Sequence, residues 1–137
     1  MIGLDTNVIV RFLVNDDVQQ AEIVEKRLVE IESSGESVLI STLVLLEVFW
    51  VLRSAYGFSQ EQIINAVQNF TGLDIVELED ENLFYELENS HSKYSADLAD
   101  QIIILNYLEL NCETCITFDK KASKVPGFEL LGQNNLR

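Results

Sequence analysis

Four acidic residues stand where a carboxylate could do chemistry. Asp5 and Asp119 each follow a short apolar segment that reads as a strand. Glu47 interrupts the apolar run LVLLEVFWVL, where burying an unpaired charge would be costly. Asp100 stands at the head of the apolar segment QIII. We therefore take these four residues as candidates for one site.

A cluster of carboxylates predicts a bound cation, because like charges raise one another's pKa unless a cation lies between them. Oxygen-only ligands select Mg²⁺ or Mn²⁺, whereas zinc prefers His and Cys ligands, which this set lacks. Such an ion can bridge a phosphodiester, lower the pKa of a bound water and stabilise the charge of an in-line displacement. The expected chemistry is metal-dependent phosphodiester hydrolysis without a nucleophilic side chain.

Each acid also has a structural interpretation. Asp5 could cap a turn, and Glu47 could form an ion pair with Arg11 or Arg53. Asp97 and Asp100 could cap a helix or favour its N-terminus. Four acids at strand and helix ends of one sheet edge favour the metal site when they are considered together.

Hydrophobic spacing predicts alternating strands and helices. The expected strands are Met1–Leu4, Val38–Ile40, Ile75–Leu78, Thr114–Phe118 and an edge strand, Phe128–Leu131. The expected helices follow Asp17, Ser41 or Thr42, Ser59, with Gln62 in a capping box, and Asp80, and a last one covers Asp97–Leu110. Strands separated by helices predict an α/β/α sandwich with a central, mostly parallel sheet. Functional sites of such sheets lie beyond the carboxyl ends of the strands, where Asp5 and Asp119 fall.

The length and composition fit one domain over residues 1–137. Of these residues, 47% are hydrophobic and one is proline, which is typical of a compact globular chain. The N-terminal segment lacks the basic region and cleavage site of a signal peptide. The longest apolar run, Val38–Leu52, is shorter than the roughly 20 residues of a membrane span, and we interpret it as a buried strand and a buried helix. We expect a cytoplasmic protein without a membrane segment.

The net charge of −14 argues against nucleic-acid binding, because phosphate contacts normally come from a basic surface. Charge is unevenly distributed, however. Lys120, Lys121 and Lys124 follow Asp119, so three of the nine basic residues flank the expected site, and a bound metal would add positive charge. The lysines either position a phosphate or belong to an ordinary solvated turn.

The other residues with chemical potential have simpler interpretations. The one histidine, His91, lies in the polar segment ENSHSK and is expected to be solvated on the surface. Cys112 and Cys115 form a single C-x-x-C pair. A redox or metal role would need a second pair, a nearby histidine or a helix N-terminus, so we expect two small apolar side chains at the start of a strand.

Three segments carry a resemblance to a known family. MIGLDTNVIV, LISTLVLLEVFWVLR and ADLADQIIILNYLELNCETCITFDKKASKVPGFELL together resemble a PIN domain, specifically the VapC ribonuclease toxin of VapBC toxin–antitoxin modules. The family's four acids match Asp5, Glu47, Asp100 and Asp119 in that order. Asp97 matches an accessory acid, and Asn7 and Thr117 match positions that support the metal shell.

The resemblance implies a PIN fold, Mg²⁺-dependent endonucleolytic cleavage of RNA, a homodimer and inhibition by a small cognate antitoxin. An acidic surface would suit the basic tail of such an antitoxin. One alternative is a PIN nuclease of RNA processing without an antitoxin, and another is a non-catalytic PIN domain that only binds. A phosphoacceptor signalling domain fits less well, because Thr6 and Asn7 follow Asp5 where such domains place adjacent acids.

Overall fold

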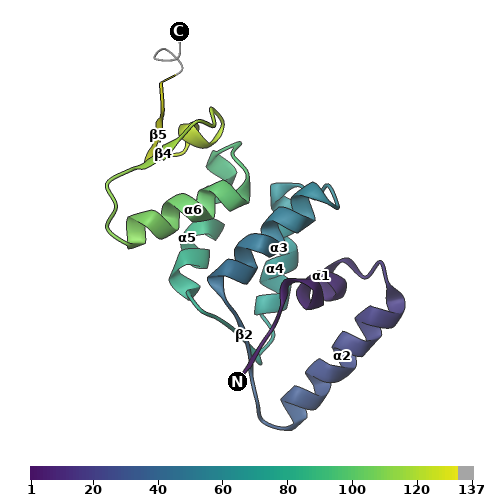
Figure 1. Ribbon diagram of the computed structural model, residues 1–137. Coiled ribbons are helices and arrows are strands. Elements are labelled where there is room, and N and C mark those ends of the chain that lie inside the picture. The colour runs from purple at the N-terminus through teal and green to yellow at the C-terminus, as the bar shows by residue number, and fades with distance from the viewer. Residues whose placement is uncertain (133–137) are drawn as a thin grey trace. The chain divides into compact units, whose positions relative to one another are not determined.

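A computed structural model describes residues 1–132, and this part of the chain divides into two compact units. The first unit spans Met1–Glu81, and the second begins at Asn82. Figure 1 shows helices and short strands alternating along the chain, as the sequence predicts for the α/β class.

The first unit is built on a three-stranded parallel sheet in the order β1-β2-β3. Its strands are β1 (Ile2–Gly3), β2 (Val38–Ile40) and β3 (Val76–Leu78), in the register Ile2↔Val38 and Val38↔Val76. The helices that join them are α1 (Thr6–Val14), α2 (Val18–Ser33), α3 (Thr42–Ser54) and α4 (Gln60–Thr71). The predicted parallel pairing of strands is confirmed. Strand β2 has the predicted bounds, whereas β1 and β3 are shorter than the expected segments Met1–Leu4 and Ile75–Leu78.

Predicted caps begin three of these helices. The Asp17 side chain accepts a hydrogen bond from the Gln20 N–H at α2, and the Ser41 side chain accepts one from Val44 N–H at α3. Ser59 and Gln62 form both hydrogen bonds of the capping box at α4. Side-chain oxygens thus satisfy N–H groups that have no partner within the first helical turn.

Helix α1 was not among the predicted elements. It begins after Asp5, whose side chain accepts a hydrogen bond from Thr6 N–H, and ends at Asn15, which has a left-handed φ of 57°. The segment Val8–Val10 consists of β-branched residues that are typical of strands. The caps at both ends, together with packing against α2 and α3, outweigh that preference.

Helix α3 is buried on one side, whereas the sequence analysis expected a buried helix. Leu45, Val48, Phe49 and Leu52 are buried in the core, but Leu43, Glu47 and Trp50 are exposed, Trp50 by 61%. The two sets alternate at the three- and four-residue spacing of an amphipathic helix. The sequence LVLLEVFWVL does not reveal this pattern, because both the buried and the exposed face of the helix carry apolar residues.

The second unit carries a two-stranded parallel sheet, formed by β4 (Cys115–Thr117) and β5 (Phe128–Leu130). Two longer helices precede it, α5 (Glu81–Ser90) and α6 (Leu98–Glu109), and the 3₁₀ turns are η1 (His91–Lys93) and η2 (Ala122–Lys124). Ala96, Ile104 and Val125 form a buried cluster, against which Cys115 and Phe128 pack. Both cysteines are free, and Cys115 takes the small apolar role expected of it.

Among the described residues, no helix is both long enough and apolar enough to cross a membrane.

Gly127 fixes the turn that leads from η2 into β5. Its φ is +105°, and a Cβ built there would lie 2.9 Å from Ile104 Cγ1. Gly127→Ala should therefore destabilise the protein by about 1–3 kcal/mol through backbone strain and crowding. Urea unfolding gives the free energy, with Gly3→Ala as the control, because a Cβ at Gly3 meets nothing within 4 Å. Equal midpoints for the two variants would contradict the expectation.

Candidate active site

Asp5 is placed by both the first strand and the first helix. It follows β1, where the Leu4 N–H still bonds to the Leu39 carbonyl at 3.1 Å, and it is the N-cap of α1. Its Oδ1 accepts the hydrogen bond from Thr6 N–H at 2.8 Å. The capping role proposed as the structural alternative is therefore real. It leaves an exposed carboxylate at the carboxyl end of a parallel strand, so it is compatible with a catalytic role.

Glu47 is exposed on α3 and accepts a hydrogen bond from the Thr6 hydroxyl. The expectation that its charge would be buried is wrong, because Glu47 lies on the exposed side of the helix. The ion pairs considered for it are not formed among the described residues: Arg11 Nη1 lies 3.3 Å from Asp16, and Arg53 Nη1 donates to the Phe58 carbonyl at 3.2 Å. The structural alternative for Glu47 thus loses its support.

Thr6 links these two acids and was missed by the sequence analysis. Its backbone N–H donates to Asp5 and its hydroxyl to Glu47. The side chain is only 4% exposed and shares the buried face of α1 with Ile9 and Val10. The sequence LDTN places a threonine directly after Asp5. Its contact with both acids could be inferred only once residues 6–14 were known to be helical.

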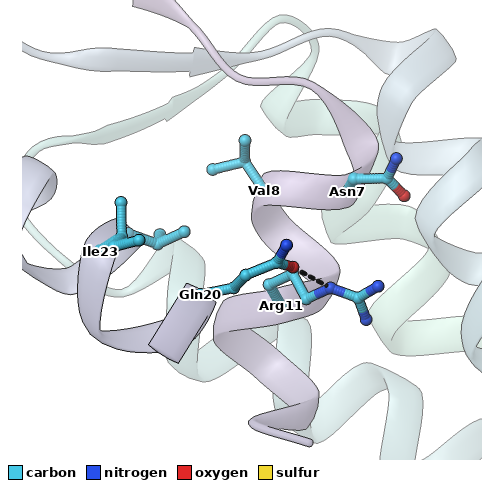
Figure 2. Close-up of a pocket in the computed structure, with 6 residues that line it drawn as sticks. Asn7, Val8, Arg11, Gln20 and Ile23 are labelled. Carbon is cyan, nitrogen blue, oxygen red and sulfur yellow. Dashed lines mark hydrogen bonds between the residues drawn. The ribbon is translucent and has the colours of Figure 1, made fainter. Parts of the chain in front are cut away.

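Asn7, predicted to support the metal shell, is exposed on α1. Figure 2 shows it on the same helix as Val8 and Arg11, and these residues line a cavity of about 320 Å³ with Gln20, Ile23 and Val24 of α2. Arg11 Nε donates to Gln20 Oε1 at 2.6 Å at this cavity. The part of Asn7 in metal binding stays a prediction.

In the second unit, the turn that follows β4 donates backbone hydrogen bonds to the Asp119 carboxylate. Its Oδ1 accepts hydrogen bonds from the N–H groups of Lys121 at 2.8 Å and Ala122 at 3.1 Å. Thr117, the last residue of β4, accepts a hydrogen bond from Asp119 N–H on its hydroxyl at 3.0 Å. Thr117 therefore supports the turn that presents Asp119, while its expected role in supporting a metal shell stays a prediction.

Asp100 lies in the first turn of α6 and is half-buried. Burial raises the pKa of its carboxyl above the ordinary value of 3.8, and the negative charges of Asp119 and Asp97 raise this pKa further. Asp97 is the N-cap of α6, one turn earlier. The charges of Asp97 and Asp119 thus lie near enough to Asp100 to disfavour its charged form, and a bound cation would favour that form.

Two further expectations concern residues of the second unit. Lys120, Lys121 and Lys124 are exposed at and around η2, directly after Asp119, which agrees with either interpretation given for them. The expectation of a solvated His91 is only partly met: the residue is half-buried, and its Nδ1 is buried without a hydrogen-bond partner among the described residues.

The four predicted acids thus occur as two pairs, Asp5 with Glu47 in the first unit and Asp100 with Asp119 in the second. Within residues 1–132, no three Asp, Glu, His or Cys side chains form a group that could hold a metal ion. Carboxylate and hydroxyl oxygens are nevertheless the ligands that suit Mg²⁺, which is commonly bound by one or two carboxylates and several waters.

Comparison with known families matches residues 2–127 to the PIN domain. This chain belongs to the PIN domain family. The match includes every predicted acid and both units. The α/β arrangement with parallel strands is consistent with the α/β/α fold of a PIN domain.

One curated relative is similar along nearly its whole length. The PIN domain described here is 21% identical to a VapC ribonuclease from Aquifex aeolicus (strain VF5) over 126 residues, which cover 92% of each chain. Together, the family and this relative support a nuclease.

The raised pKa of Asp100 predicts how the metal-free PIN domain responds to pH. Its folded state holds this proton more tightly than its unfolded state, so stability is lost as pH rises from the unfolded pKa through the raised folded pKa. Asp100→Asn removes the charge that folding disfavours. At pH 7 in EDTA, its urea midpoint should exceed that of the wild type, and the difference should vanish below pH 3.8.

Asp74→Asn is the control, because Asp74 is an exposed aspartate of the first unit. An Asp100→Asn midpoint at pH 7 below both the wild type and this control would contradict the expectation.

Proposed function

We propose that the protein is a Mg²⁺-dependent endoribonuclease and the toxin of a type II toxin–antitoxin system, acting in the cytoplasm. Asp5, Glu47, Asp100 and Asp119 are its proposed catalytic and metal-binding residues. The observation that carries the proposal is that each unit holds a pair of these acids. In the first unit, Thr6 donates hydrogen bonds to both Asp5 and Glu47. In the second, burial, and after it the negative charges of Asp119 and Asp97, raise the pKa of Asp100. The likeness to a VapC ribonuclease supports RNA as the substrate.

The donor set fits the proposed ion. Every ligand is a carboxylate oxygen, which favours Mg²⁺, or Mn²⁺ in its place, over zinc. When bound, the ion would supply positive charge for the phosphodiester and lower the pKa of a water. Burial, and after it the negative charges of Asp119 and Asp97, disfavour the charged form of Asp100, and a cation bound there would favour that form.

The chain's own residues supply position and orientation. Asp5 and Asp119 each have one carboxylate oxygen fixed by backbone N–H donors, so each carboxylate is held before any ligand arrives. Pre-organised carboxylates lose less conformational entropy on binding. Asp97 is proposed as an accessory acid, while Asn7 and Thr117 are proposed to support the ligands.

The lysines that follow Asp119 are proposed to contact RNA. Lys120, Lys121 and Lys124 are exposed, and they concentrate positive charge in a chain whose net charge is −14. Contacts of this kind bind phosphate without reading sequence. They would offset the repulsion between the acidic protein and the RNA backbone in the region of the turn.

The antitoxin is proposed as a small cognate protein with a basic segment. An excess of 23 acidic over 9 basic residues favours a positively charged partner. The proposal of a toxin, rather than a PIN nuclease of RNA processing, rests on the VapC relative.

Glu47→Gln tests the catalytic assignment. The change keeps the shape of the side chain and removes its charge, so RNA cleavage at saturating Mg²⁺ should fall about 100-fold or more, as expected for lost electrostatic stabilisation. Since Glu47 is exposed, the urea midpoint in EDTA should stay near that of the wild type. Cleavage of total RNA, with EDTA replacing Mg²⁺ in a parallel reaction, measures the activity.

Glu25→Gln is the matched control, because Glu25 is an exposed glutamate in α2 of the same unit. It should cleave as the wild type does. Full cleavage by Glu47→Gln, or cleavage by the wild type that persists in EDTA, would refute the proposed site.

The protein is also expected to form a homodimer. Apolar side chains exposed on α3, Leu43 at 79% and Trp50 at 61%, give the chain surface that a partner could cover. Light scattering at micromolar concentration should give twice the mass of 15.6 kDa. A single-chain mass at every concentration would contradict it.

A further inference from the structure

We propose that Thr6 is a positioning residue that sets the orientation of both Asp5 and Glu47 for metal binding. The inference rests on the proposed function and extends it to a residue that is not an acid. It starts from one observation: Thr6 donates its backbone N–H to Asp5 Oδ1 at 2.8 Å and its hydroxyl to Glu47 Oε1.

Thr6 is held rigidly enough to position other groups. It is the first residue of α1, its side chain is 4% exposed, and it shares the core-facing side of the helix with Ile9 and Val10. A β-branched side chain has few χ1 rotamers, so a buried threonine presents its hydroxyl in a defined direction. The direction is toward α3, the helix that carries Glu47.

Among residues 1–132, by contrast, the Thr6 hydroxyl is the hydrogen-bond donor that holds the Glu47 carboxylate. It is exposed, and a free glutamate side chain samples many rotamers, which costs conformational entropy when a ligand requires one of them. The Thr6 hydroxyl donates a hydrogen bond to Glu47 Oε1. This bond restricts the rotamers of the carboxylate before a metal binds. Groups that hydrogen-bond to metal ligands in this way typically change metal affinity or activity by about 10–100-fold.

We expect the protein to fold without the hydrogen bond from Thr6 to Glu47. Since Glu47 is exposed, water can replace the Thr6 hydroxyl as its donor, so no buried carboxylate is left unpaired when the hydroxyl is removed. Valine has nearly the shape of threonine and keeps the contacts of the buried methyl group. The positioning role can therefore be separated from a structural one.

The experiment is a Mn²⁺ titration of the full chain, with free Mn²⁺ followed by electron paramagnetic resonance and metal-free melting temperature measured in parallel. Thr6→Val and Thr6→Ala lack the hydroxyl, and each should bind Mn²⁺ about 10–100-fold more weakly than the wild type. Thr6→Ser restores the hydroxyl and should recover most of the affinity. Thr71→Val is the matched control, because the Thr71 hydroxyl donates to the Gln68 carbonyl in the same unit.

The outcome depends on whether Mn²⁺ affinity separates the proteins with a hydroxyl at position 6 from those without one. Thr6→Ala and Thr6→Ser still allow this comparison if Thr6→Val folds poorly. Affinity that follows the hydroxyl, with Thr6→Ser near the wild type and Thr6→Ala far below it, is the expected result. The role of Thr6 is overturned if Thr6→Val binds Mn²⁺ as the wild type does while Thr6→Ser binds weakly, or if the wild type and the three Thr6 variants bind equally. In either case, Mn²⁺ binding and RNA cleavage by the wild type would still support the proposed function. A wild-type protein that neither binds Mn²⁺ nor cleaves RNA overturns both.

Discussion

Repulsion between carboxylates is the constraint on which the candidate site depends. A chain with a net charge of −14 gathers Asp97, Asp100 and Asp119 in one unit, where burial, and after it the negative charges of Asp119 and Asp97, raise the pKa of Asp100. Hydrogen-bond donors or a nearby cation favour the charged form of such carboxylates. Backbone donors hold the carboxylates of Asp5 and Asp119, and the oxygen atoms of the predicted acids would suit a hard cation.

The donors come from local structure and need few side chains. Asp5 is held because it caps α1, and Asp119 because the chain after β4 turns back so that two N–H groups point at one oxygen. The same hydrogen bonds that begin a helix or close a turn therefore also orient a carboxylate. Capping and catalysis were considered as alternatives for Asp5, but the structure shows that one oxygen can cap while the carboxylate remains exposed.

The sequence predicted the elements that have strong local signals and missed those decided by packing. The caps at Asp17, Ser41 and Ser59 and the three strands of the first sheet were predictable from residue type and spacing. Helix α1 was not, because its β-branched residues favour a strand until tertiary contacts override them. The expectation that Glu47 carries a buried charge was wrong, since a run of apolar residues in the sequence does not reveal which face of α3 meets solvent.

Thr6, which the sequence analysis did not predict, shows which functional residues can be found from spacing and which cannot. Acids are visible in a sequence because a charge within an apolar segment calls for an explanation. A threonine is unremarkable there, and its importance depends on which atom its hydroxyl reaches across two helices. Thr6 meets an acid 41 residues away, a relation that neither helical nor strand periodicity encodes. Residues that orient ligands are therefore found in contacts, whereas residues that carry charge are found in the sequence.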